Sequence, residues 1–400
     1  MTSRAQGIQR KVVILGWYGS NNTGDEAVLQ AVVGALRQRG FDRLHVLSTA
    51  PGQTAEKFNV SSSPRTPTLE SIKALQNGAT LILGGGGLIQ DGTSVYNLPL
   101  YALYVALARL FGLKVICWGL GVEPLWTPLG KALARFIVRS SSHFSVRDDI
   151  SRSILARAGV PMEQVTVSAD PAFLIEPHSD SMQEPRERPL VIFCVRHLSD
   201  NHPGINFHYL LPVSLRRRLG LGWRPPAERN ERFMEGLARG MKVCTMEFGA
   251  DVVLLPLWPG RDDSMLDELE RVASHMEVPA QQLNRAEIPP EPSRVSAFIR
   301  GADLLVSMRL HALIFGATHA VPVLALSYAH KVRGLMKLLG MERWVVEVET
   351  RTPPIEELET KLRVLWKLRA EEAARLGELA VAARATAEAD ADNIAALLDS

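Results

Sequence analysis

Residues 12–26 join a short apolar run to a polar turn: Val12-Val13-Ile14-Leu15-Gly16-Trp17-Tyr18-Gly19-Ser20-Asn21-Asn22-Thr23-Gly24-Asp25-Glu26. A helical pattern of apolar residues follows directly. A second junction of this kind lies far along the chain, where apolar residues 304–306 precede Ser307-Met308-Arg309-Leu310-His311-Ala312 and another helical pattern. Open α/β sheets bind ligands where strands end and helices begin. The two junctions therefore predict two Rossmann-like, doubly wound sheets that face one cleft.

Strand and helix patterns alternate through both halves, as expected for an α/β chain with parallel sheets. In the first half we expect strands at 11–16, 43–48, 80–83, 114–119, 143–146 and 165–168, with helices at 25–39, 96–111, 128–140 and 149–158. In the second half we expect strands at 190–195, 251–256, 304–307 and 321–327, with helices at 228–249, 264–275, 292–301 and after His311.

These patterns divide the chain into three parts. Residues 1–178 form an N-terminal domain, and a polar, proline-bearing linker spans 176–189. Residues 188–350 form a second domain of the same class. Residues 351–400 are rich in Ala, Glu, Leu and Arg and predict an amphipathic helix pair that packs on one domain.

Composition limits the class of protein. A chain of 400 residues exceeds what a single core usually supports, which favours two domains. The formal net charge of +2 provides no field to attract nucleic acid. The three cysteines lie singly in or beside apolar segments, without metal-ligand spacing, so we expect core residues in a reducing, cytoplasmic compartment and no metal or cofactor. Charged residues interrupt the longest apolar stretch, 98–122, so it is too short to span a membrane.

Four consecutive glycines, Gly84 to Gly87, follow an expected strand and precede Asp91. Glycines let backbone N–H groups approach a ligand closely, so Gly85 and Gly86 with Asp91 are candidates for ligand binding. A tight turn that requires positive φ is the alternative interpretation.

The turn that begins the first helix is a second candidate. Thr23 or Asp25 as the N-cap is the simpler interpretation. A cap requires only one polar side chain, however, and this turn contains three more than that with Asn21, Asn22 and Thr23 beside Asp25. Amide and carboxylate side chains suit the hydroxyl groups of a sugar. Asp25 is then placed to act as general base on such a hydroxyl.

The second half contributes basic side chains at equivalent strand ends. Arg196 follows the first strand of that half, Arg309 and His311 follow the third, and Lys331 follows the fourth. Guanidinium groups make bidentate contacts to phosphate and carboxylate. The set predicts a pocket for a small ligand with two acidic groups. Arg147 lies at a strand end of the first half, where a site role and an ion pair at a helix start both remain open.

The ordered motifs resemble those of the polysaccharide pyruvyl transferase family, most closely its CsaB-type members. The resemblance covers about residues 11–340 and is carried by these segments: Gly19-Ser20-Asn21-Asn22-Thr23-Gly24-Asp25-Glu26, Gly84-Gly85-Gly86-Gly87-Leu88-Ile89-Gln90-Asp91, Ser145-Val146-Arg147-Asp148, Ala169-Asp170-Pro171 and Ser307-Met308-Arg309-Leu310-His311-Ala312.

The resemblance implies two Rossmann-like domains arranged as in GT-B glycosyltransferases. It implies transfer of pyruvate from phosphoenolpyruvate to a sugar as a cyclic ketal. In CsaB-type enzymes the sugar is N-acetylmannosamine of a lipid-linked precursor of secondary cell-wall polysaccharide, and the ketal anchors surface-layer proteins. Such an enzyme is expected in the cytoplasm, at the inner face of the membrane.

By position, the resemblance assigns Arg196, Arg309, His311 and Lys331 to the donor-binding and catalytic group, and the residue chemistry of the first half assigns that half to the acceptor. His311, Lys331 and Asp25 are the expected catalytic residues. The donor, phosphoenolpyruvate, is expected to contact Arg196, Arg309, Leu310 and Arg147. The acceptor is expected to contact Asn21, Asn22, Thr23, Gly85, Gly86 and Asp91.

Two other functions remain open from the sequence. A GT-B glycosyltransferase would also hold an anionic donor, a nucleotide sugar, in its second domain. A non-catalytic glycan-binding protein is the other alternative. Residues 207–224 combine aromatic and leucine side chains with Arg216, Arg217 and Arg218, and either contact an anionic membrane surface or form an ordinary helix packed on their own domain.

Overall fold

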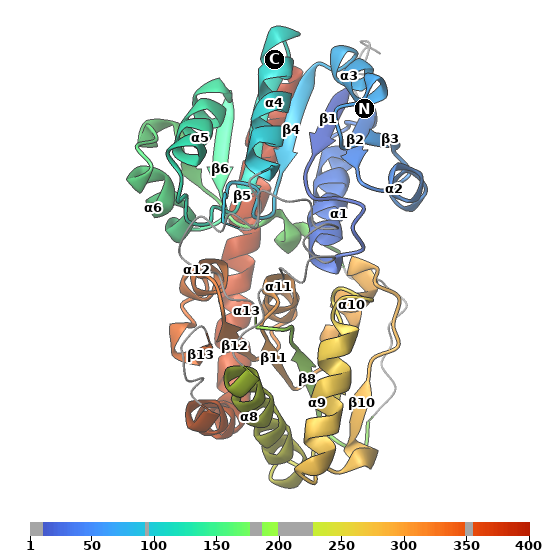
Figure 1. Cartoon of the computed structure of the whole chain (residues 1–400), viewed down its shortest axis with the longest axis vertical. Coiled ribbons are helices and arrows are strands. Elements are labelled where there is room, and N and C mark those ends of the chain that lie inside the picture. Colours follow the sequence, from blue (N-terminus) through green and yellow to red (C-terminus); the bar gives the residue numbers. More distant parts are fainter. Residues whose placement is uncertain (1–10, 93–95, 177–185, 199–226, 349–354) are drawn as a thin grey trace, which may run out of the picture.

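The structure, a computed structural model, describes residues 11–92, 96–176, 186–198, 227–348 and 355–400. These residues form two parallel sheets with flanking helices, one above the other in Figure 1. The α/β class and the pair of Rossmann-like sheets are as predicted. Among the described residues no helix is both long and apolar enough to cross a bilayer.

The N-terminal sheet has the strand order β3-β2-β1-β4-β5-β6-β7, and all neighbours are parallel. Its strands are β1 (Val12–Leu15), β2 (Leu44–Ser48), β3 (Ser61–Pro64), β4 (Thr80–Gly84), β5 (Lys114–Leu120), β6 (His143–Val146) and β7 (Thr166–Val167). Its helices are α1 (Thr23–Gln38), α2 (Pro51–Phe58), α3 (Leu69–Gln76), α4 (Asn97–Leu110), α5 (Pro128–Ser140) and α6 (Asp149–Arg157), followed by the short 3₁₀ turns η1 (Met162–Gln164) and η2 (Pro171–Leu174).

The central strands of this sheet are buried on both sides, which explains their continuous apolar sequence. All four residues of β1 are buried. Val12 and Ile14 pack in the core that contains α1, whereas Val13 and Leu15 pack in a second core that contains α4. Successive side chains of a strand point to opposite faces, so a strand covered by helices on both faces needs no polar positions.

The C-terminal sheet has the order β10-β9-β8-β11-β12-β13 and is again parallel. Its strands are β8 (Leu190–Cys194), β9 (Asp251–Leu254), β10 (Leu283–Arg285), β11 (Leu304–Ser307), β12 (Val323–Ser327) and β13 (Val345–Glu347). Its helices are α8 (Ala227–Met246), α9 (Asp263–His275), α10 (Pro292–Ile299), α11 (Leu310–Thr318) and α12 (His330–Leu338), with 3₁₀ turns η4 (Ala280–Gln282) and η5 (Glu342–Trp344).

Both sheets reverse their strand order at the same relative place. In the N-terminal sheet the loops after β1 and β4 diverge, and in the C-terminal sheet those after β8 and β11 diverge. Such a switch point is where open α/β sheets bind ligands. The polar turn 16–22, the glycines 84–87, Arg196 and Arg309 therefore all lie at switch points.

The C-terminal segment is one helix, α13 (Ile355–Asp399), so the predicted helix pair is wrong. Gly377 is the single glycine in this stretch and proline is absent from it, so no turn divides the helix. The helix also contacts both domains instead of one, as Figure 1 shows. Asp390 accepts hydrogen bonds from His143 (2.7 Å) and Ser145 (2.6 Å) of β6, whereas Glu372 accepts one from Trp344 of the C-terminal domain (2.6 Å).

Three predictions concern segments outside the described residues. The centre of the linker expected at 176–189, and with it the domain boundary at 178, falls in the gap 177–185. The boundary at 350 falls in the gap 349–354. The segment 207–224, considered for membrane contact, falls in the gap 199–226.

Candidate functional site

The carboxyl edges of the two sheets meet directly. The backbone N–H of Thr23 donates to the Leu257 carbonyl (2.9 Å), and the Trp258 indole donates to the Ser20 carbonyl (3.0 Å). Gly24 lies so close to the imidazole of His311 that a Cβ on Gly24 would be 2.1 Å from Nδ1. The start of α1 is therefore docked against the start of α11, and Thr23 and His311, predicted from the two halves of the chain, lie at one interface.

The start of α1 holds Asp25 in a defined position. Asn22 is the N-cap, so the prediction of Thr23 or Asp25 as the cap is wrong. Its side-chain oxygen accepts from the Gly24 N–H (3.2 Å), and its amide nitrogen donates to Asp25 (2.5 Å). Asn21 is exposed and adopts φ of 57°, a left-handed conformation that asparagine tolerates better than most residues. Asn22 thus orients the Asp25 carboxylate.

Asp25 is poised to exchange a proton near neutral pH. Burial raises the pKa of its carboxyl to about 7, and the neighbouring Glu26 also raises it, against the opposing effect of Lys331. The glycine loop lies beside it, because a Cβ on Gly86 would be 3.5 Å from Asp25 Oδ1. Gly85 and Gly86 have φ of 54° and 73°, so this loop requires glycine for its conformation as well as for its close approach.

His311 belongs to a buried chain of polar groups. Its Nε2 lies 3.8 Å from Oδ2 of Asp170, and the same carboxylate oxygen accepts from Arg147 Nη1 at 3.2 Å. Burial lowers the pKa of His311 to about 4, although Asp170 opposes this shift. The imidazole is therefore neutral at neutral pH. Its Nε2 is buried and has no hydrogen-bond partner in the described part of the chain, so it is available to a ligand.

Arg147 is placed differently from the expectation that it contacts the donor. Its guanidinium is buried between Asp170 and Asp148, whose nearest carboxylate oxygen is 3.5 Å from Nε. Two carboxylates already neutralise this cation. The ion pair considered from the sequence is thus present, and Arg147 supports Asp170 behind His311.

Arg309 also has an acidic partner that the sequence did not reveal. Its Nη2 donates to Asp262, a buried residue in the turn that precedes α9. Asp262 is held in turn by the backbone N–H groups of Leu257 (3.2 Å) and Trp258 (2.9 Å). The Nε of Arg309 is buried without a hydrogen-bond partner among the described residues. Nε and Nη2 share one edge of a guanidinium, so Asp262 holds this edge through Nη2 and leaves the neighbouring Nε–H without a partner among the described residues.

Tyr328 lies at the centre of the remaining cations. Its hydroxyl accepts a hydrogen bond from Arg196 Nη1 (3.2 Å), and the guanidinium carbon lies 4.9 Å from the ring centroid. Lys331 Nζ lies 5.3 Å from the same centroid. Burial raises the pKa of the phenol, but Lys331, Arg196 and Arg309 outweigh burial and lower the pKa to about 7. Three cations thus act on this one phenol.

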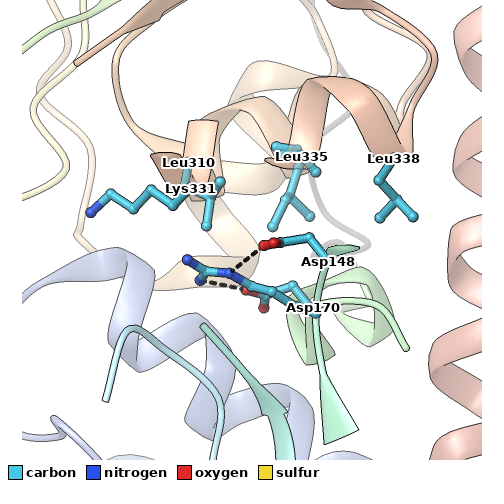
Figure 2. Close-up of a pocket in the computed structure, with 8 residues that line it drawn as sticks. Asp148, Asp170, Leu310, Lys331, Leu335 and Leu338 are labelled. Carbon is cyan, nitrogen blue, oxygen red and sulfur yellow. Dashed lines mark hydrogen bonds and ion pairs between the residues drawn. The ribbon is translucent and has the colours of Figure 1, made fainter. Parts of the chain in front are cut away.

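A small cavity lies between the two domains, and Lys331 is among the residues that line it (Figure 2). Asp148 and Asp170 line it from the N-terminal domain, and Leu310, Lys331, Leu335 and Leu338 line it from the C-terminal domain. In Figure 2 the ammonium end of Lys331 extends away from Asp148. Arg147 and Ile314 complete the lining, so the cavity wall carries the two carboxylates of Asp148 and Asp170 and the two cations of Arg147 and Lys331.

Asp91 serves the fold instead of the cleft. Its carboxylate accepts hydrogen bonds from the backbone of Trp126 (2.9 Å) and from both the backbone and hydroxyl of Thr127 (2.8 and 2.6 Å). Thr127 is the N-cap of α5. Asp91 therefore fixes the start of this helix, and its contact with the acceptor stays a prediction. Within the described residues, no group of three or more His, Cys, Asp or Glu side chains is arranged to hold a metal ion.

Residues 22–330 match the family model described as polysaccharide pyruvyl transferase, a span that includes β2 to β12 and the starts of α1 and α11. The chain belongs to the polysaccharide pyruvyl transferase family. It is 22% identical over 389 residues to the amylovoran biosynthesis protein AmsJ of Erwinia amylovora, with 85% of this chain and 88% of that protein covered. The resemblance seen in the motifs is confirmed, and the protein is an enzyme, a pyruvyltransferase of polysaccharide biosynthesis.

Solved structures support the GT-B-like arrangement of this pyruvyltransferase. Anabaena HepE in complex with UDP and glucose matches with a TM-score of 0.59 at 13% identity, covering 98% of this chain and 99% of that one. The S. aureus MnaA–UDP co-structure matches with a TM-score of 0.57 at 11% identity, covering 92% and 94%. At such identities the likeness concerns the fold.

The closeness of Gly24 to His311 leads to a first prediction for the pyruvyltransferase. Gly24→Ala should lower activity by about 10²-fold, because the new methyl group forces the imidazole to move by about 1 Å or more. Gly34→Ala is the matched control on the same helix, since nothing lies within 4 Å of its Cβ position. This control should keep full activity and gain up to about 1 kcal/mol of stability. Pyruvyl transfer and thermal unfolding of both variants would test this, and equal activity of the two variants would contradict the inferred packing.

Proposed function

We propose that the enzyme transfers the pyruvyl group of phosphoenolpyruvate to two hydroxyls of a saccharide as a cyclic ketal and releases phosphate. The observation that carries this proposal is the group of Arg196, Arg309 and Lys331 around Tyr328, with a buried unpartnered N–H on Arg309. A compact donor with a phosphate and a carboxylate matches such a group in size and charge. Arg196 and Arg309 bind its anionic groups, and Lys331 assists the departing phosphate.

The residues of the N-terminal domain suit the acceptor. Protonation of the donor's methylene carbon makes C2 electrophilic, a saccharide hydroxyl adds to C2, and a second hydroxyl then displaces phosphate. Each hydroxyl must lose a proton. Asp25, with its pKa raised to about 7, accepts one of them, while Asn22 and the glycine loop orient the sugar. The neutral imidazole of His311 binds the phosphate or relays a proton.

We further propose N-acetylmannosamine of a lipid-linked cell-wall precursor as the acceptor, following the CsaB-type resemblance. Such a substrate would bring the enzyme to the inner face of the cell membrane. Phosphate release from phosphoenolpyruvate in the presence of an N-acetylmannosamine glycoside tests the reaction. Ketal formation is then checked by mass spectrometry, since the acceptor gains the mass of pyruvate minus water. Absence of phosphate release with this and other saccharides would refute the proposal.

The competing reaction is glycosyl transfer from a nucleotide sugar, because HepE and MnaA are described with bound UDP. Calorimetric titration of the enzyme with UDP and with phosphoenolpyruvate separates the two donors. Tight binding of UDP together with no binding of phosphoenolpyruvate would favour the glycosyltransferase.

Arg196→Lys tests whether guanidinium geometry matters for the donor. Lysine keeps the charge but cannot make the planar pair of hydrogen bonds. We expect KM for phosphoenolpyruvate to rise about tenfold, which corresponds to about 1.4 kcal/mol of lost binding, with KM for the acceptor unchanged. Arg333→Lys on α12 is the control, since Arg333 pairs with Glu347 (3.0 Å). An effect of Arg196→Lys on the acceptor alone would move this residue to the other half of the cleft.

A further inference from the structure

Tyr328 is a buried phenol at the carboxyl edge of the C-terminal sheet. Its side chain is 6% exposed, and its oxygen accepts a hydrogen bond from Arg196. A phenol can accept and donate at once. Its two polar neighbours, Arg196 and Lys331, are both donors, so neither of them can accept the phenol proton. The residue begins the loop between β12 and α12, at the carboxyl edge of the sheet, where the donor is proposed to bind.

The surroundings of Tyr328 favour loss of that proton. The groups that face the phenol are Arg196 from the loop after β8, Arg309 from the loop after β11 and Lys331 from α12. Asp262 neutralises part of the Arg309 charge, so Arg196 and Lys331 stabilise the phenolate most directly. Other buried tyrosines differ: burial raises the pKa of Tyr101 to about 12 and raises the pKa of Tyr18 and Tyr104.

We propose that Tyr328 is the acid that protonates the methylene carbon of the donor, an inference that rests on the proposed pyruvyl transfer. The competing acid, His311, is unsuitable because its pKa is lowered to about 4 and it carries no extra proton at neutral pH. A phenol with a pKa near the working pH is protonated in much of the enzyme and still gives up its proton easily. General acid catalysis requires both properties.

Protons and electron pairs balance over the cycle. The phenol O–H bond breaks and the alkene electron pair forms a C–H bond, which leaves a methyl group and an electrophilic C2. The first hydroxyl oxygen bonds to C2, and its proton passes to Asp25. The second hydroxyl oxygen bonds to C2 as the C2–O bond to phosphate breaks, with the electron pair leaving on phosphate. Its proton returns to the Tyr328 phenolate, and Asp25 gives its proton to the released phosphate or to water.

Tyr328→Phe tests the assignment, because it removes the proton and leaves the ring between the cations. We expect kcat for phosphate release to fall about 10²–10⁴-fold. Affinity for phosphoenolpyruvate, measured by calorimetry, should change by no more than about tenfold, in line with the loss of one hydrogen bond. Tyr104→Phe is the matched control, since this buried phenol donates to the Arg65 carbonyl (3.0 Å) away from the cations. It should keep wild-type turnover.

Replacement of Tyr328 by 3-fluorotyrosine, which has a more acidic phenol, gives an independent measurement. The fall in kcat at alkaline pH should move to lower pH, because this limb reports loss of the acid's proton. Wild-type turnover by Tyr328→Phe, an unmoved alkaline limb, or parallel loss of donor binding and turnover would each overturn the assignment of Tyr328 alone. A wild-type enzyme that releases no phosphate from phosphoenolpyruvate would overturn the pyruvyl transfer as well.

Discussion

Replacing His311 by alanine should lower phosphate release from phosphoenolpyruvate by about 10²–10⁴-fold, the usual range for loss of a group that moves a proton or contacts the reacting centre. His311 lies against Gly24 where the two domains meet and has a buried ring nitrogen without a partner among the described residues. Because burial lowers its pKa to about 4, its role is that of a neutral imidazole, and its loss should not shift either limb of a pH–rate profile between about pH 5 and 8.

His319→Ala is the control for this variant. His319 ends the same helix, contacts Ser296 (2.9 Å) and also has a pKa lowered to about 4 by burial. Its replacement removes a similar side chain at the far end of α11. Turnover of the His319 variant should stay at the wild-type level. If the two variants had similar turnover, both histidines would contribute only to packing. His311 would then lose its assigned role.

The placement of the candidate site residues was predictable from the sequence where a residue directly follows a buried strand. Arg196, Arg309 and Lys331 each follow an apolar strand, and parallel strands bring their carboxyl ends to one edge. Asp262 was missed because it lies in a turn several residues beyond β9, just before α9. An aspartate at such a position is usually interpreted as the N-cap of the helix. Tyr328 was missed as a functional group because its position among three cations depends on the packing of three separate loops.

The fold was predictable where strands are buried on both faces and therefore read as apolar runs. The edge strand β3 reads Ser61-Ser62-Ser63-Pro64 and carries no such signal. It is held by pairing with β2 and by His45, whose two ring nitrogens contact Ser61 (2.9 Å) and Ser63 (2.8 Å). These are contacts between neighbouring strands, which no local pattern displays. The same holds for α13, whose association with both domains depends on Asp390 and Glu372.

The raised pKa of Asp25 should make the free energy of unfolding depend on pH. The pKa of this group is raised from 3.8 to about 7 in the folded protein. A raised acid pKa means that the folded state holds its proton more tightly than the unfolded state does. Stability therefore falls as pH rises from about 4 towards 7 and remains lower above that range. Removing the charge should relieve this penalty, as is common for groups kept for function.

Asp25→Asn should accordingly lose about 10²–10⁴-fold in kcat while melting at the same or a higher temperature than the wild type at pH 8. Because the carboxylate acts as the base, wild-type kcat should rise with pH through about 7 on its acid limb, and this limb should vanish in the variant. Glu26→Gln is the matched control. Glu26 is buried in the same turn and accepts from the Gly19 N–H (2.7 Å), a contact that glutamine can preserve. Since Glu26 helps raise the pKa of Asp25, the Glu26→Gln substitution should leave the plateau value of kcat unchanged and move the acid limb of the pH–rate profile to lower pH.

An acid limb that persists in Asp25→Asn would assign the base to another residue.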